Sequence, residues 1–305
     1  MSDSDRQLIV LLPDRRRFSG QGLSPAIAKL LGRADSIAGG KAGELAQLLR
    51  YFSVLPQGWP MAAITREADA RDAAGSLWLR ADPVTLQPDM TGVRLVAWGN
   101  LALTAEEAEG FMQALRPLFG DAGFLISAPV PDRWYLKLAR GSRVPKFATP
   151  LDGMGEDLLA HLPEGPDGTR WRALLNEAQI TLHNHPLNIA RLGAGKPLVN
   201  SVWFWGGGIL PDQVSCAVAS IVSEDDELLA LAALAGASRN ETGGTLMDLR
   251  HERDWSVVER GPLALASLKL RHSSVLLDFA DGARWRIAAR QAWRIWRQPL
   301  NGLGL

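Results

Sequence analysis

An uninterrupted run of branched apolar residues near the N-terminus predicts a buried strand over residues 7–13. The run ends at Asp14, which places a carboxylate at the carboxyl end of the expected strand. A helical pattern follows over residues 24–31, where Ser24 is suited to cap the helix and Pro25 to occupy its first position. A buried strand followed by a helix is typical of an α/β domain.

The middle of the chain has a different pattern, in which short strands surround one helix. Thr104 and Glu107 form a capping box ahead of an apolar stripe at helical spacing, so a helix is expected from residue 104. Short apolar runs predict two strands before this helix and two after it. We therefore expect an α+β lobe over residues 76–149, inserted into a larger body made of residues 1–75 and 150–305.

The second half returns to alternating strands and helices. The alternating patterns cover residues 169–183, 200–205, 217–222 and 225–235. They predict parallel strands joined by crossover helices. From about residue 262 we expect a C-terminal extension, with a hairpin around Ala280-Asp281-Gly282 and a short basic-aromatic helix over residues 290–298.

Charge and apolar runs narrow the range of partners. The 33 Lys and Arg residues equal the 33 Asp and Glu residues, so no overall charge attracts nucleic acid or an anionic membrane. Apolar runs fall short of a membrane span, and the single Cys216 cannot form an internal disulfide. We expect a cytoplasmic protein with no nucleic-acid or membrane partner. The C-terminal Trp and Arg residues are expected to dock on the body or on a partner protein rather than on a membrane surface.

The segment from Asn184 to Pro211 carries most of the candidate chemistry. Its Gly206-Gly207-Gly208 turn follows a strand, where backbone N–H groups can bind a phosphate or carboxylate; the alternative is a sharp exit from a buried strand. Arg191 and Lys196 are candidate donors to the same anion, or else solvated charges on a turn.

Histidines and N-terminal arginines are weaker candidates. His183 and His185 can share one face of an extended segment and begin a metal site, but His185 is better suited to donate to an anion or to cap a helix. Arg15, Arg16 and Arg17 follow the first strand directly, as a solvated loop or as part of an anion site.

The region from His185 to Pro211 resembles the signature His-Pro-x-Asn … Arg … Gly-x-Pro … Asn-x-x-x-x-x-Gly-x-Gly-x-x-Pro of archaeal-type cofactor-independent phosphoglycerate mutases. The matching positions are His185, Pro186, Asn188, Arg191, Lys196, Pro197, Asn200, Gly206, Gly208 and Pro211. These enzymes belong to the alkaline phosphatase superfamily. The resemblance implies an alkaline-phosphatase-like parallel-sheet body, here shortened at its C-terminus, with the inserted lobe; it also implies that Arg133 meets the phosphorylated substrate.

The chain also resembles bacterial proteins of the regulatory protein RpfE type. The features that carry this likeness are the overall size, the segment Trp203-Phe204-Trp205 with its following glycines, and the terminal segment Trp293 to Pro299. This second resemblance implies a regulatory role.

The chain departs from the mutases at their reaction centre. Those enzymes hold two divalent metals with Asp and His ligands, use a Ser as phosphoryl acceptor, and end their first strand in Asp-Gly. Here Asp14 is followed by Arg15, and the Asp-His ligand block near the C-terminus has no counterpart. The departures favour a catalytically degenerate protein that needs no metal cofactor and whose catalytic residues are unknown.

We therefore expect a regulatory or sensor protein that binds a small phosphorylated or carboxylate metabolite. The expected anion pocket takes charge, hydrogen bonds and backbone donors from Arg133, His185, Asn188, Arg191, Lys196, Asn200, Gly206, Gly207 and Gly208. One alternative is an active phosphoglycerate mutase or phosphatase with Mn or Zn held by Asp14, Asp82 and His185. Another is a structural module that binds a partner protein.

Overall fold

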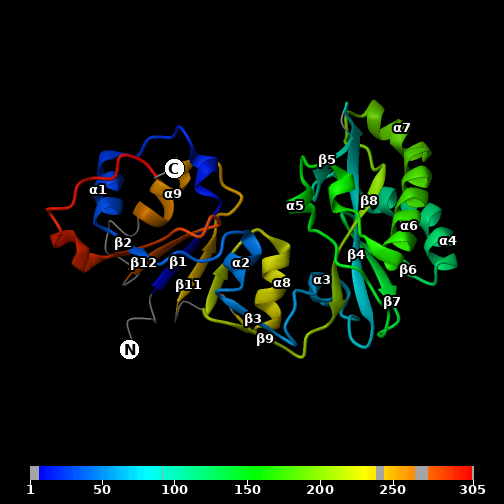
Figure 1. The fold of residues 1–305 in the computed structure, drawn as a ribbon, viewed down its shortest axis with the longest axis horizontal. Coiled ribbons are helices and arrows are strands. Elements are labelled where there is room, and N and C mark those ends of the chain that lie inside the picture. Colours follow the sequence, from blue (N-terminus) through cyan, green and yellow to red (C-terminus); the bar gives the residue numbers. More distant parts are fainter. Residues whose placement is uncertain (1–6, 91, 238–243, 265–273, 304–305) are drawn as a thin grey trace. The chain divides into compact units, whose positions relative to one another are not determined.

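The computed structural model describes residues 7–90, 92–237, 244–264 and 274–303 and divides the chain into two compact units (Figure 1). Unit 1 comprises Met1–Val54 and Gln213–Leu305, and unit 2 comprises Leu55–Asp212. The expected inserted lobe of residues 76–149 is therefore too short at both ends. Residues 55–75 and 150–212 belong with it because they supply a strand and helices that pack on its sheet.

Unit 1 is built on a six-stranded mixed sheet with the order β10-β11-β1-β12-β13-β2. Its strands are β1 (Gln7–Leu12), β2 (Asp35–Ile37), β10 (Ser220–Val222), β11 (Thr245–Asp248), β12 (Ser274–Phe279) and β13 (Arg284–Ala288). The first four strands in this order, β10, β11, β1 and β12, are parallel, so their carboxyl ends meet at one edge of the sheet. β13 and β2 continue the sheet in antiparallel pairing.

Helices and short turns complete unit 1. They are η2 (Arg15–Phe18), α1 (Pro25–Arg33), α2 (Glu44–Leu48), α8 (Asp226–Leu234), α9 (Trp255–Val258), η4 (Glu259–Leu263) and η5 (Ala289–Trp293), with the two-stranded pair β3 (Phe52–Leu55) and β9 (Gln213–Cys216). α1 begins as the sequence predicts, because Ser24 caps it and Pro25 stands in its first turn. Leu8, Val10 and Leu12 of β1 pack in the core with residues of α1 and α9.

Unit 2 is built on a five-stranded antiparallel sheet. Its strands are β4 (Leu77–Pro88), β5 (Val93–Trp98), β6 (Leu125–Val130), β7 (Arg133–Leu138) and β8 (Ser201–Ile209), and its helices are α3 (Met61–Ala70), α4 (Ala105–Asp121), α5 (Pro150–Gly153), η3 (Leu158–His161), α6 (Gly165–His183) and α7 (Pro186–Gly193). β4 is the central strand: Arg80 pairs with Tyr135 of β7 on one edge and with Trp205 of β8 on the other.

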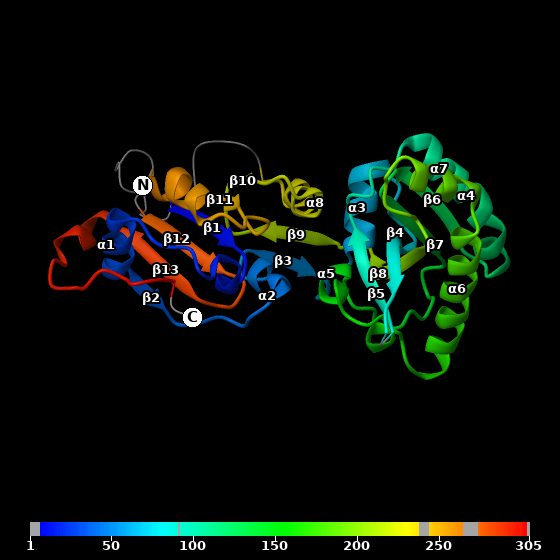
Figure 2. The same cartoon turned by 90° about the horizontal axis from the view of Figure 1, so that it is seen from above.

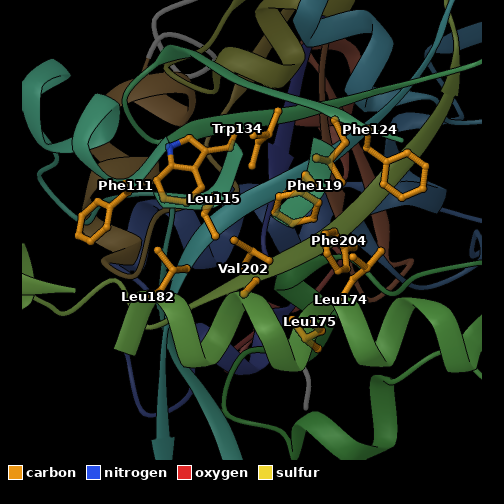
Figure 3. Close-up of a cluster of buried hydrophobic side chains, with 14 of the residues drawn as sticks. Phe111, Leu115, Phe119, Phe124, Trp134, Leu174, Leu175, Leu182, Val202 and Phe204 are labelled. Atoms are coloured by element: carbon orange, nitrogen blue, oxygen red, sulfur yellow. The ribbon is translucent and has the colours of Figure 1, made fainter. Parts of the chain in front are cut away.

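The two faces of this sheet are covered by different helices (Figure 2). Leu79, Val202 and Phe204 belong to a large core with residues of α4 and α6, which Figure 3 shows in close-up. Trp78 points to the opposite face and packs with Tyr135 and residues of α3. This two-sided cover explains a wrong prediction. β8 was expected to be a parallel strand, but it pairs antiparallel with β4. The sequence pattern could not distinguish the two, because a strand buried on both faces is apolar throughout whether its partner is parallel or antiparallel.

Other sequence predictions can be checked in the same way. The capping box of Thr104 and Glu107 is confirmed at α4, and β12 and β13 form the expected hairpin around Asp281. The expected C-terminal helix of residues 290–298 is wrong, because helical turns end at Trp293. Among the residues that the structure describes, no helix combines the length and apolarity of a membrane span.

Candidate functional site

Arg191, one of the sequence candidates for anion binding, is a buried structural residue of unit 2. Its Nε donates to the Pro197 carbonyl at 2.9 Å and its Nη1 to Glu107 Oε2 at 2.8 Å, while Nη2 donates to the Leu101 carbonyl. Lys196 Nζ lies 3.8 Å from the same Glu107 carboxylate. Glu107 thus joins its own capping box to Arg191, and the Arg191 charge is already paired.

The two asparagines near Arg191 hold backbone segments together. Asn188 donates to the carbonyls of Leu182 and Val199 and accepts from Val199 N, at 2.8–2.9 Å. Asn200 makes a reciprocal pair with Leu86, accepting from its N–H and donating to its carbonyl at 2.8 Å each. Both side chains therefore fix the path from α6 through α7 to β8.

His185 caps α7. Its Nδ1 accepts from Leu187 N at 3.3 Å, and its ring packs on Phe111 with 4.7 Å between centroids. Burial lowers the pKa of His185, although a hydrogen bond to the Gly110 backbone opposes the shift. His183 lies exposed at the end of α6. The helix-capping alternative for His185 is the one that the structure shows.

The three glycines lie inside β8 and do not form an open turn. Gly206 has φ of 66°, and a Cβ there would lie 3.2 Å from Ala62 N. A Cβ on Gly208 would lie 2.5 Å from Pro60 Cβ. These glycines let the start of α3 approach the strand closely, which corrects the expectation that they cradle an anion.

Arg133 also has a partner within unit 2. It forms a bidentate pair with Asp69 of α3, with Nε–Oδ2 at 2.9 Å and Nη2–Oδ1 at 2.8 Å. The Tyr135 hydroxyl donates to the same carboxylate at 2.5 Å. Arg133, Arg191 and the glycines thus serve separate contacts, and the structure does not gather them into one pocket.

Asp82, a weak candidate metal ligand, is fully buried and surrounded by donors. Arg80 binds both of its oxygens at 2.7 and 2.8 Å, and the indole N–H groups of Trp98 and Trp205 donate at 3.0 and 2.7 Å. Asp14 belongs to unit 1, where it accepts from Arg16 N and caps η2. The trio of Asp14, Asp82 and His185 is therefore not assembled as a metal site within either unit.

Unit 1 gathers ionisable side chains that the sequence did not single out, at the carboxyl edge of its parallel strands. This is the position at which open α/β sheets bind ligands. We call the group the carboxyl-edge cluster: Glu44, Ser223, Asp225, Asp248 and Arg250. The available signal was the Asp-Leu-Arg sequence directly after the apolar run of β11, in the same place as Asp14 after β1.

Arg250 is the centre of this cluster. Its Nε and Nη2 donate to the two Asp248 oxygens at 2.8 Å each, and Nη2 also donates to Asp225 Oδ2 at 2.6 Å. Its Nη1 lies 3.6 Å from Glu44 Oε2, longer than a hydrogen bond. Burial opposes the charge of Asp248, but the bonds and charge of Arg250 lower its pKa below the ordinary value.

Glu44 has the opposite pKa shift. Burial raises its pKa, and the positive charges of Arg250 and Arg17 compensate only in part. This carboxylate lies at the start of α2, half-buried and 3.6 Å from Arg250 Nη1.

A second ion pair lies near the carboxyl end of β12, the strand next to β1. Asp278 is fully buried, accepts from the Tyr51 hydroxyl at 2.5 Å and pairs with Arg50. Burial raises the pKa of Asp278. Gln47 donates to the carbonyls of Leu12 and Asp278 and so ties α2 to the ends of two adjacent strands.

Comparison with known proteins relates the chain to phosphoglycerate mutases over part of its length. The chain matches no family model. It is 29% identical over 136 residues to a probable 2,3-bisphosphoglycerate-independent phosphoglycerate mutase of Geobacter sulfurreducens, covering 45% of this chain and 34% of that protein. It is 30% identical over 127 residues to the corresponding enzyme of Methanosarcina acetivorans, covering 40% and 31%. The match thus spans about a third of the length of these relatives.

Solved structures give a weaker likeness. The cofactor-independent phosphoglycerate mutase of Thermoplasma acidophilum aligns over 93% of this chain and 89% of its own, with 17% identity and a TM-score of 0.42. A TM-score below 0.5 does not establish a common fold. The observed fold class is mixed α/β, with one sheet partly parallel and one antiparallel.

The relatives correct one expectation. The chain was expected to need no metal cofactor, but the relatives are phosphoglycerate mutases of the type that, by the resemblance described above, holds two divalent metals. In the ranges that the structure describes, no three His, Cys, Asp or Glu side chains are grouped as such a site requires. The described residues therefore do not fit a two-metal centre, and no step through a metal is derived.

Proposed function

We propose that this chain is a phosphoglycerate mutase-related regulatory or sensor protein that binds a small phosphorylated or carboxylate metabolite at the carboxyl-edge cluster of unit 1. The observation that carries the proposal is the position of Arg250 at the carboxyl edge of the parallel strands, where its Nη1 lies 3.6 Å from the half-buried Glu44 carboxylate. Sequence similarity to phosphoglycerate mutases supports the ligand class, and the resemblance to the RpfE type supports the regulatory role.

Glu44 occupies the place that the ligand would take. Burial disfavours the charge of Glu44, so a ligand anion can compete with its carboxylate for Arg250. A phosphate or carboxylate of the ligand would then accept hydrogen bonds from Arg250 Nη1, which lies too far from Glu44 to donate to it. Arg17, exposed on η2, would add a second cation.

Arg250 is suited to this role because its orientation is fixed. The bidentate bonds to Asp248 and the bond to Asp225 hold the guanidinium in one orientation. In this orientation Nη1 is the nitrogen nearest Glu44. The same bonds support binding without turnover, since the carboxylates of Asp225 and Asp248 are already paired with a cation.

The proposal is tested by thermal unfolding and calorimetry with 3-phosphoglycerate, with sulfate at matched ionic strength as the control. At a hundredfold excess over its dissociation constant, the ligand should stabilise the protein by about 2.7 kcal/mol. Arg17→Ala should weaken binding roughly fivefold, since an exposed contact contributes up to about 1 kcal/mol. Glu44→Gln should strengthen it. Arg16→Ala is the matched control, because Arg16 is an equally basic, exposed neighbour.

The names of the relatives favour a second candidate, an active phosphoglycerate mutase or phosphatase that requires Mn or Zn. An assay of the interconversion of 3- and 2-phosphoglycerate, with and without Mn²⁺, distinguishes the two. Turnover that requires the metal would replace the sensor proposal with this one. Binding of 3-phosphoglycerate without turnover in either condition would support the sensor.

A further inference from the structure

The C-terminal segment of unit 1, from Ala289 to Leu300, has two arginines, Arg294 and Arg297, that bind residues at the end of α1. Arg294 Nη1 donates to the Arg33 carbonyl at 3.1 Å and pairs with Asp35, and Arg297 Nη1 donates to the Ala34 carbonyl at 2.8 Å. Leu300 N donates to the Ala28 carbonyl at 2.9 Å. The segment is therefore bound along α1 and its C-terminal end by polar contacts.

Its large apolar side chains face solvent. Trp293, Ile295 and Trp296 are 83%, 78% and 73% exposed, more than most large apolar side chains in the described part of the chain. Tryptophans are usually buried and arginines exposed, but here Arg294 and Arg297 are held against the protein while Trp293 and Trp296 face solvent. Adjacent exposed aromatic residues on a rigid segment mark an interaction surface.

The same region is strongly basic. Between Gly282 and the last residue the chain has five arginines and no Asp or Glu. Arg286 on β13 and Arg290, three residues before Trp293, are exposed, and Lys29 is exposed on α1, one turn before Arg33. A second copy of the chain would bring like charges together, so the complementary partner is anionic.

We infer that this surface, formed by Trp293, Ile295 and Trp296 with Arg290, binds the surface of an anionic lipid bilayer. Tryptophan favours the boundary between headgroups and acyl chains, and Ile295 adds an aliphatic side chain suited to the acyl region. Exposed arginines attract phosphate and carboxylate headgroups. The sequence alone favoured docking on the body or on a protein, because the predicted helix is too short for strong membrane attachment. The structure instead shows a single short 3-10 helix, η5, that ends at Trp293, with both tryptophans outward.

The test is co-sedimentation of the full chain with large vesicles, comparing phosphatidylcholine alone with phosphatidylcholine that contains about one third phosphatidylglycerol. We expect binding to the anionic vesicles and a marked loss of binding at high salt, because surface charges are screened. Trp293→Ala combined with Trp296→Ala should weaken binding at least tenfold. Arg290→Gln should weaken it roughly fivefold, the equivalent of about 1 kcal/mol per cation.

The matched control is Ile189→Ala with Leu192→Ala, which removes two comparably exposed apolar side chains (78% and 68%) from unit 2. This variant should bind vesicles as the unchanged protein does, and all variants should keep its melting temperature because the altered side chains are exposed. Equal binding to neutral vesicles, undiminished binding by the tryptophan variant, or no vesicle binding would each overturn the inference; the last result would direct attention to an acidic protein.

Discussion

Arg250 and Asp248, which are two residues apart in the chain, form a bidentate ion pair with both N···O distances at 2.8 Å. Arg80 and Asp82 form the same kind of pair in unit 2, at 2.7 and 2.8 Å. The pair in unit 2 is enclosed by indole donors, whereas the pair in unit 1 lies beside the half-buried Glu44 carboxylate. This difference in surroundings is why we assign the ligand site to unit 1.

Arg250→Met should destabilise the protein by about 3–5 kcal/mol, because it leaves the buried Asp248 carboxylate without its partner. Urea unfolding followed by circular dichroism measures the change. Arg253→Met, which alters an exposed arginine three residues away, is the control and should change stability by less than about 0.5 kcal/mol. Equal effects of the two variants would contradict the structural role of Arg250.

The same pair predicts a pH dependence. Since the folded pKa of Asp248 is lowered, its contribution to stability is present above the ordinary value of 3.8 and is lost as the pH falls through the folded pKa. In Arg250→Met, burial remains without the opposing cation, so the pKa of Asp248 should rise. The stability difference between the two proteins should therefore begin to narrow above pH 3.8, where Asp248 of the variant is protonated, and narrow further as the pH falls through the lowered pKa of the unchanged protein; a constant difference across the acid range would contradict this account.

Gly208→Ala should destabilise unit 2 by about 1–3 kcal/mol, because the new methyl group would overlap Pro60 and force the start of α3 away from β8. Gly207→Ala is the control. Its Cβ would meet the end of the flexible Leu79 side chain at 3.1 Å, so it should cost less. Thermal unfolding gives the comparison. A larger cost for Gly207→Ala would show that close approach of α3 is not the reason for these glycines.

Arg191→Met should cost about 3–5 kcal/mol in free energy of unfolding, because Glu107 and two carbonyl groups lose a buried partner. Lys196→Met, at a half-buried position 3.8 Å from the same carboxylate, should change stability by less than about 0.5 kcal/mol. If instead both variants kept full stability and lost affinity for 3-phosphoglycerate, the result would support the anion pocket expected from the sequence.

Local sequence signals predicted local structure well. The capping box at Thr104, the cap at Ser24 and the hairpin at Asp281 are confirmed because each depends on residues close together in the chain. The direction of β8 was not predictable, since it depends on pairing with β4, more than 100 residues away.

The prediction of the anion site from the sequence failed for a related reason. Arginine and asparagine look the same in a sequence whether they bind a ligand or the protein backbone, and the partners of Arg191 and Asn188 include Leu101 and Leu182, which no polar pattern marks. The carboxyl-edge cluster was missed because Glu44, Asp225 and Asp248 are far apart in the sequence and meet only at the edge of the sheet.

The most direct test of the proposed function is isothermal calorimetry of 3-phosphoglycerate with the unchanged protein, Arg17→Ala and Glu44→Gln, each with a sulfate control. We predict specific binding that weakens in Arg17→Ala and strengthens in Glu44→Gln, because one variant removes a cation from the carboxyl-edge cluster and the other removes its competing anion. Absence of binding beyond sulfate, or equal affinity in all three proteins, would contradict the assignment of the ligand site to unit 1.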